Sequence, residues 1–68
     1  MITVVANSRP VELPDGSTLA SLLDALGIAA QAVAALEHNG EAVARGDHAA
    51  RRLSDGDRVE LVRAVAGG

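Results

Sequence analysis

The stretch LPDGSTLASLLDALGI, residues 13–28, decides the fold because it holds the strongest periodic pattern in the chain. Its leucines recur at the spacing i, i+3, i+4 and i+7, which aligns them on one face of an α-helix. These residues are Leu19, Leu22, Leu23 and Leu26. A single apolar stripe suits a helix that covers one face of a sheet. The sequence therefore predicts one amphipathic helix of about nine residues packed on a sheet.

Both ends of this helix carry capping signals. Ser17 or Thr18 can act as the N-cap, because either hydroxyl can accept a hydrogen bond from a free N–H group of the first turn. Gly27 stands where a left-handed residue commonly ends a helix, and Ile28 can fold back onto the last turn. We therefore expect the helix to end at Gly27.

A hairpin is predicted before the helix. Residues 1–6 are rich in β-branched side chains, residues 7–9 have turn character, and residues 11–13 alternate as a second strand would. The Pro-Asp-Gly sequence at residues 14–16 then ends the pattern. The chain is thus expected to turn back on itself once before it enters the helix.

A second hairpin and a final strand are predicted after the helix. Asn39-Gly40 is a strong signal for a two-residue hairpin turn, and the segments 33–38 and 41–44 flank it as strands. The remaining elements are an irregular polar segment with one short helical turn, a tight turn and a final strand, at residues 46–52, 55–57 and 58–61. This order of elements predicts an α+β fold.

The final strand presents apolar residues on both of its faces. Val59 and Leu61 share the face expected to meet the core. Val62 and Ala64 fall on the opposite face, and Val65 falls on the inner one. Apolar side chains on a solvated face beside a chain end indicate a docking surface, unless a loop or the end of the helix covers them.

The composition limits both the core and the partners. Of the 68 residues, 49% are hydrophobic, but none is aromatic and none is Cys, so the core of one small domain must consist of Val, Leu, Ile and Ala. No disulfide or Cys/His metal cluster can support it. The formal net charge is −3 and all six basic residues are Arg. This disfavours nucleic-acid binding, because phosphate neutralisation supplies most of that affinity.

Signals for a membrane or for catalysis are absent from the sequence. The apolar run at residues 2–6 is too short for a signal peptide or a membrane span, so we expect a cytoplasmic protein that binds no membrane. His38 beside the Asn-Gly turn and His48 in the polar segment are expected to be solvated, because no motif joins either to a nucleophile. The chain is therefore predicted not to be an enzyme and to bind no cofactor or metal by itself.

The sequence ends in RAVAGG, residues 63–68, and the two terminal glycines have no side chain to pack. An ionised α-carboxylate is a weak nucleophile and a poor electrophile. Useful chemistry there requires activation by ATP to an acyl-adenylate inside another protein's active site. Glycine lacks a Cβ atom and so allows the close backbone approach that a narrow channel demands. The C-terminus is thus the expected reactive group.

Four segments of the chain together resemble the ThiS family, the sulfur carriers of thiamine biosynthesis. They are LPDGSTLASLLDALG, NGEAVAR, LSDGDRVELVRAV and the terminal GG, and their order matches the family over essentially the whole chain. The resemblance implies the β-grasp fold of ubiquitin, in which a mixed sheet of four or five strands wraps one helix. The expected division is a β-grasp domain, residues 1–66, and a flexible Gly-Gly tail, residues 67–68.

The resemblance also implies a chemistry for Gly68. An E1-like adenylyltransferase of the ThiF type would adenylate its carboxylate with ATP and Mg, and a sulfur donor such as a cysteine desulfurase would convert it into a thiocarboxylate. A thiazole synthase of the ThiG type would then take the sulfur. Gly67, Val62, Ala64 and Val65 would contact these partners. The absence of Cys agrees with this chemistry, because a thiocarboxylate needs only a C-terminus.

Other assignments remain open at this point. The related MoaD-type carriers of molybdopterin synthesis have the same fold and ending, although they tend to be longer and often contain aromatic residues. A carrier for another sulfur metabolite is a second alternative. A ubiquitin-like modifier or a non-catalytic interaction module comes from a different class. A polymer-forming modifier needs acceptor lysines, which this chain lacks.

Overall fold

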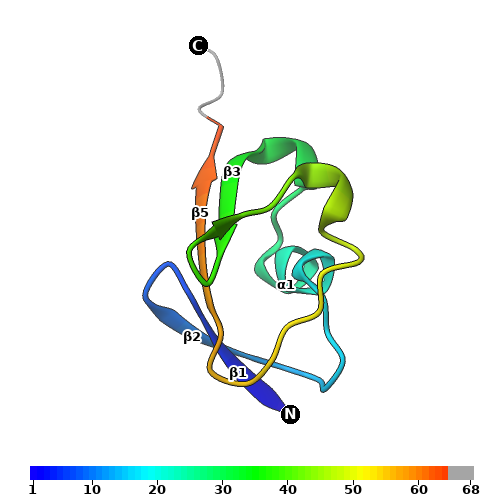
Figure 1. Cartoon of the computed structure of the whole chain (residues 1–68), viewed down its shortest axis with the longest axis vertical. Coiled ribbons are helices and arrows are strands. Elements are labelled where there is room, and N and C mark those ends of the chain that lie inside the picture. Colours follow the sequence, from blue (N-terminus) through cyan, green and yellow to red (C-terminus); the bar gives the residue numbers. More distant parts are fainter. Residues whose placement is uncertain (65–68) are drawn as a thin grey trace.

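A mixed sheet of five strands wraps around one α-helix in the computed structural model, which describes residues 1–64 (Figure 1). The elements are β1 (Ile2–Ala6), β2 (Arg9–Leu13), α1 (Leu19–Leu26), β3 (Val33–His38), β4 (Glu41–Ala42) and β5 (Arg58–Arg63). Two short 3₁₀ turns, η1 (Ala30–Ala32) and η2 (Arg45–Asp47), lie before β3 and after β4. The strand order is β2-β1-β5-β3-β4, and β1 runs parallel to β5. The predicted α+β fold is confirmed.

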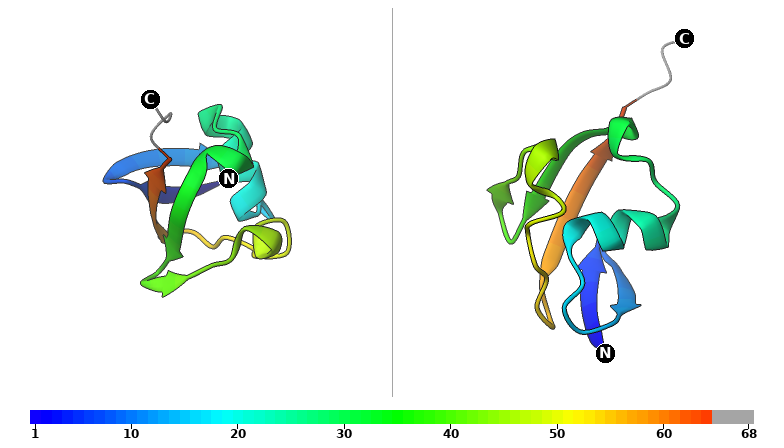
Figure 2. Two further views of the ribbon diagram at one scale, coloured as in Figure 1. Left: turned by 90° about the horizontal axis from the view of Figure 1, so that it is seen from above. Right: turned by 90° about the vertical axis from the view of Figure 1, so that its right-hand side faces the viewer.

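α1 lies against one side of the sheet, as Figure 2 shows in two views, and the hydrophobic core fills the space between them. The most deeply buried large side chains come from the central strands and from the helix: Val4, Val59, Leu19 and Leu22. Leu26, at the end of the predicted stripe, is only half-buried. The core is entirely aliphatic, as the composition predicts, so its stability depends on close packing of small side chains.

Capping interactions at both ends of α1 agree with the sequence. Thr18 is the N-cap: its Oγ1 accepts a hydrogen bond from the backbone N–H of Ser21 (3.2 Å), and the Ser21 Oγ accepts one from the Thr18 N–H (3.1 Å). Ser17, the other candidate, instead donates its hydroxyl to the Pro14 carbonyl (2.7 Å). Gly27 adopts the left-handed conformation (φ 70°) and ends the helix. Local caps are therefore present at both helix ends, and at the first turn the N–H groups of Leu19 and Ala20 also donate to the carbonyls of Arg51 and His48 (3.0 and 3.2 Å).

The first hairpin is tighter than predicted. Its turn consists of Asn7 and Ser8, both in the left-handed region (φ 48° and 68°), so β2 begins at Arg9 rather than at Val11. Pro10 fits within the strand because β2 is an edge strand, where a missing N–H removes no hydrogen bond from the interior of the sheet.

The second hairpin turns at Asn39 and Gly40, as predicted, with φ values of 51° and 84°. Its return strand β4 has two residues, whereas the sequence predicted a strand over residues 41–44. The difference arises at Val43, which is buried in the core and donates its N–H to the Leu36 carbonyl (3.0 Å). This bond continues the register of the hairpin by one residue, after which the chain leaves the sheet and enters η2.

β5 continues to Arg63, so Val62 lies within the strand, as its predicted outward phase requires, and Ala64 lies one residue beyond it. Arg63 lies opposite Val33 at the start of β3. A register shift next to Val33 marks a bulge in β3, which increases the local twist of the strand pair. The predicted boundary between residues 66 and 67 lies outside the described residues.

Candidate functional site

β5 leads the chain toward the predicted reactive terminus. Because β5 runs parallel to β1, its end points away from Met1 (Figure 1), and Asn7 contacts the strand at Leu61, two residues before that end. The final described residue, Ala64, donates its N–H to the Ala32 carbonyl (2.7 Å). Three of the predicted site residues come after Ala64 and lie outside the described residues: Val65, Gly67 and Gly68.

The Asn7 side chain holds β5 close to its end. Its Nδ2 donates to the Leu61 carbonyl (3.0 Å), and its Oδ1 accepts from the Leu61 N–H (2.8 Å). The backbone N–H of Asn7 donates to the Val59 carbonyl (2.9 Å). The amide thus takes the place of a strand backbone where β1 has ended. Sequence reasoning treated Asn7 only as a turn residue, because nothing local connects it to a strand 54 positions away.

Val62 and Ala64, the predicted docking residues, point away from the core. Val62 lies on the outer face of the sheet and is 61% exposed, and Ala64 is exposed just beyond the strand. Val62 is paired with Ala35 of β3, which is also exposed. Within residues 1–64, neither a loop nor the end of α1 covers them. Their predicted orientation is confirmed, and their contact with a partner stays a prediction.

Two carboxylates lie next to Val62 and Ala35 on the outer face of the sheet. Glu37 of β3 and Glu60 of β5 lie directly opposite each other on the same outer face, and both are exposed. Neither forms an ion pair within the described residues. Like charges directly opposite on a sheet are destabilising. The outer face near the end of β5 is therefore not arranged to maximise stability.

At the opposite end of β5, His38 is buried (6% exposed), so the prediction of a solvated histidine was wrong. Pairing between β3 and β5 extends up to this residue and encloses it. Its Nε2 lies 2.7 Å from the Asp57 Oδ2, and the Arg51 Nε donates to its Nδ1 (3.1 Å). Because a guanidinium can only donate, Nδ1 is the acceptor and Nε2 carries the proton. His38 has no free nitrogen with which to act as a general base.

Asp57 is the centre of this polar network. Burial raises the pKa of its carboxyl group, but hydrogen bonds from the Ser54 N–H (2.8 Å), from His38 and from the Asn39 amide (3.1 Å) outweigh burial. The pKa of Asp57 therefore lies below its ordinary value. The ionised carboxylate joins the turn before β5 to the β3–β4 hairpin.

Arg51 completes the network from the loop that precedes Leu53. Arg51 is half-buried, whereas its neighbour Arg52 is exposed. Besides its bond to His38, Arg51 forms an ion pair with Glu41. The hydrogen bond from Arg51, together with its charge, lowers the pKa of Glu41. These contacts tie three separate segments together, which is a structural role.

His48 is also buried (4% exposed), again contrary to the prediction. It follows η2, and it lines small cavities that also border α1 and β3. Neither ring nitrogen has a hydrogen-bond partner within the described residues. An imidazole without a bonded carboxylate or nucleophile has no catalytic arrangement. Residues 1–64 also contain no group of three metal-ligating side chains.

Across the same residues, no helix reaches the length and hydrophobicity that a membrane crossing requires.

Comparison with known proteins gives consistent matches over this whole fold. The model of the ThiS family matches residues 2–68. A thiazole synthase from Magnetococcus marinus is 39% identical over 62 residues, which make up 91% of this chain. The chain spans only 19% of the length of that protein. The match therefore concerns one segment of the thiazole synthase, and the activity of the whole protein does not follow from it.

Solved structures agree in fold as well as in sequence. The crystal structure of the thiamine biosynthesis protein ThiS from Geobacter metallireducens has a TM-score of 0.79 and 31% identity, covering 98% of this chain and all of that one. An NMR solution structure of a thiamine biosynthesis protein from the same organism has a TM-score of 0.78 and 33% identity, covering 98% of this chain and 88% of that one. The expected β-grasp architecture is thereby confirmed.

Proposed function

The chain belongs to the ThiS family of ubiquitin-like sulfur carriers in thiamine biosynthesis, and we propose that it carries sulfur as a thiocarboxylate on Gly68. The observation that carries this proposal is that the family match continues through residue 68 and so includes both terminal glycines. The crystal and NMR structures are both of a thiamine biosynthesis protein from Geobacter metallireducens, which favours the thiazole pathway over the molybdopterin alternative.

The proposed chemistry starts with the Gly68 carboxylate as a nucleophile. One carboxylate oxygen attacks the α-phosphorus of Mg-bound ATP on a ThiF-type adenylyltransferase, and pyrophosphate leaves. A persulfide sulfur, supplied by a donor such as a cysteine desulfurase, then attacks the acyl carbon and AMP leaves. A thiol then attacks the donor's sulfur in the remaining sulfur–sulfur bond, forms a disulfide with the donor, and the thiocarboxylate leaves. ATP and Mg belong to the enzyme's site, so the carrier is a co-substrate and not a catalyst.

The geometry of the last strand supports this role. Asn7 holds Leu61 with two side-chain hydrogen bonds, and Ala64 is bonded to Ala32. The domain thereby fixes the direction in which the chain leaves the sheet. A fixed exit lowers the entropy that a partner must overcome when it draws the following residues into an active site. The glycines add no Cβ atom that would widen the required channel.

The proposed partners act in sequence on the same terminus. The adenylyltransferase would contact Val62 and Ala64 together with the residues that follow, namely Val65 and Gly67. A ThiG-type thiazole synthase would then take the sulfur for the thiazole ring. The 39% identity between this chain and a segment of a thiazole synthase supports this link. Because the first step consumes ATP, we place the reaction in the cytoplasm.

The proposal is tested by ATP–pyrophosphate exchange on the ThiF-type enzyme. The full chain should support exchange, because adenylation of Gly68 is reversible. A chain with one alanine added after Gly68 should support none, since the carboxylate is displaced and a methyl group enters the channel. Equal exchange with both chains would refute Gly68 as the adenylated residue.

A further inference from the structure

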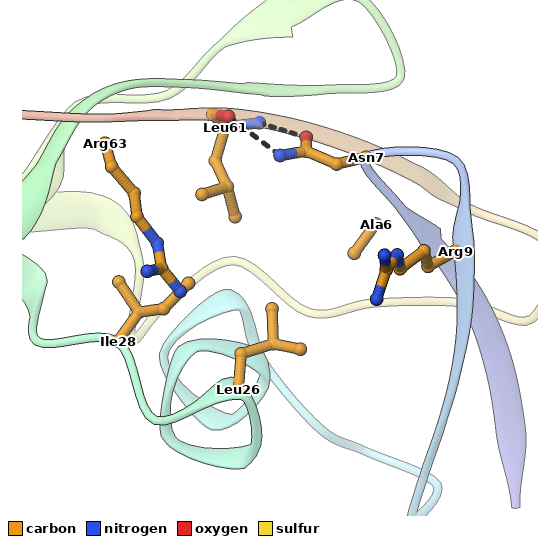
Figure 3. Close-up of a pocket in the computed structure, with 7 residues that line it drawn as sticks. All are labelled: Ala6, Asn7, Arg9, Leu26, Ile28, Leu61 and Arg63. Atoms are coloured by element: carbon orange, nitrogen blue, oxygen red, sulfur yellow. Dashed lines mark hydrogen bonds between the residues drawn. The ribbon is translucent and has the colours of Figure 1, made fainter.

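A groove with arginines on both sides lies beside the end of β5, on the helix side of the sheet (Figure 3). Its volume is about 380 Å³. Aliphatic side chains form the floor: Ala6, Leu26, Ile28 and Leu61. Arg9 and Arg63 flank this floor from opposite sides, and no Asp or Glu lines it. We call this feature the arginine groove.

The alternation of side chains along β2 and β5 explains why Arg9 and Arg63 lie beside the apolar floor of the groove. Arg63 follows Leu61 on the inward-facing side of β5, and Arg9 is paired with the buried Ala6. Each arginine occupies an inward position at the end of the sheet, where both side chains are nevertheless exposed. An arginine can lay its aliphatic stem along an apolar floor while its guanidinium group reaches solvent.

Neither guanidinium group has a partner in the described part of the chain. The ion pairs of residues 1–64 are Met1–Asp15, His38–Asp57 and Arg51–Glu41. The Asn7 amide in the groove wall bonds to the Leu61 backbone and forms no hydrogen bond with either arginine. Since the whole chain has a net charge of −3, the positive charge here is a local feature. The groove therefore presents guanidinium donors that no residue among 1–64 occupies and that an external acceptor can bind.

An apolar floor between two guanidinium groups fits a polypeptide segment that bears carboxylates beside an apolar side chain. Carboxylates match the planar donor geometry of Arg in a bidentate way, and the apolar side chain can fill the floor. A nucleic acid would leave the floor unfilled and would find no aromatic side chain for base stacking. A free phosphate would also contact the arginines alone.

The position of the groove identifies the partner. Arg63 precedes Ala64, the last described residue, so an enzyme that binds the residues after Ala64 must approach the groove. We propose that the arginine groove docks an acidic segment with an apolar anchor that belongs to the adenylating enzyme. This inference rests on the proposed function, because it takes that enzyme as the partner. It adds a second contact face, since Val62 lies on the other side of β5.

Charge reversal of both arginines tests this inference. The R9E/R63E chain is compared with wild type and with R52E, since Arg52 is exposed and does not line the groove. The dissociation constant for the ThiF-type enzyme is measured at low and at high salt. At low salt the double variant should bind about tenfold more weakly or worse, and its affinity should depend less on salt. The R52E chain should bind like wild type.

Unchanged affinity of R9E/R63E would overturn the inference, and so would an equal loss in R52E, because net charge alone would then explain the effect. If circular dichroism shows that the double reversal unfolds the domain, R9Q/R63Q replaces it and should also weaken binding.

Exchange assays separate the groove proposal from the proposed function. R9E/R63E should raise the carrier concentration for half-maximal exchange while leaving the maximal rate near normal. A wild-type chain that supports no exchange would refute the proposed function, whereas normal exchange with undiminished binding in R9E/R63E would refute the groove alone.

Discussion

The two ends of the β3–β5 strand pair differ in whether their side chains are bonded within the domain or exposed to solvent. At the start of β5, His38 bonds to both Asp57 and Arg51, and Asp57 also accepts from the Ser54 N–H. At the end of β5, Val62 is exposed and Arg63 has no ion pair within the described residues. The polar side chains at the start of β5 are therefore hydrogen-bonded within the domain, whereas the side chains at its end face solvent.

This difference separates stability from function. The half-buried Asp57 carboxylate and the buried His38 imidazole are paired with each other. Leaving either of them unpaired in the interior would cost about 1–3 kcal/mol. An exposed arginine or valine costs the fold little and can contact a partner. We therefore assign the His38 end to the stability of the domain and the Val62 end to recognition. Substitutions at the two ends should affect different measurements.

The largest effect is expected from removing the two terminal residues. A chain that ends at Ala66 should lose all activity as a sulfur acceptor, because the reactive carboxylate is displaced. Its thermal midpoint should match that of the full chain, since Gly67 and Gly68 have no side chain to bury. Circular dichroism reports the midpoint, and ATP–pyrophosphate exchange reports activity. A markedly lower midpoint would assign the glycines to the fold instead.

The next largest effect is expected from a substitution in the hydrophobic core, and it is an effect on the free energy of unfolding. Leu22 is fully buried, so Leu22→Ala should lower the free energy of unfolding by about 2–5 kcal/mol. Leu26→Ala is the matched control and should cost less, because Leu26 is only half-buried. Denaturant titration followed by circular dichroism measures both. A loss below about 0.5 kcal/mol at Leu22 would show that the helix faces the other way.

A smaller effect is expected at the His38 end. Asp57→Asn removes the charge that His38, Ser54 and Asn39 stabilise, and it should lower the free energy of unfolding by about 1–3 kcal/mol. Binding to the adenylating enzyme should not change. Asp24→Asn, at an exposed position on α1, should leave stability near wild type. An Asp57→Asn chain that folds normally but fails in exchange would assign this end to function.

The same variant also has a characteristic pH dependence. The pKa of Asp57 in the folded chain lies below its ordinary value of about 3.9. Its contribution is therefore fully present above that value and is lost as the pH falls through the folded pKa. The stability difference between wild type and Asp57→Asn should shrink in acid. A constant difference across the acid range would mean that the charge contributes nothing.

The smallest effect on stability is expected at the outer face. Val62→Asp or Ala64→Asp should change the free energy of unfolding by no more than about 0.5 kcal/mol, because both residues are exposed. Either should weaken binding to the adenylating enzyme by about 1 kcal/mol or more. Ala50→Asp, at an exposed loop position on another part of the surface, should leave binding unchanged. Unfolding of the Val62 variant would show instead that this residue supports the core.

Local signals explain what the sequence predicts well. The helix was located because its stripe and both caps lie within residues 17–27, so each contact joins close neighbours. The turn at Asn39 and Gly40 was located for the same reason. The outward direction of Val62 follows from simple alternation in β5.

Contacts between distant segments explain what the sequence did not reveal. His38 and Asp57 are 19 positions apart, and only the pairing of β3 with β5 brings them together and buries the imidazole. Arg9 and Arg63 border one groove because β2, β1 and β5 are neighbours in the sheet. No local pattern marks these residues, because each would look like an ordinary exposed polar side chain in its own segment.

The most direct test of the carrier assignment is the intact mass of the chain after incubation with ATP, the ThiF-type enzyme and a persulfide sulfur donor. We predict a mass increase equal to the exchange of one oxygen for one sulfur, located in the terminal peptide that contains Gly68. Sulfur found at any other position, or a mass that stays unchanged although the enzyme and donor are active on another carrier, would contradict the assignment.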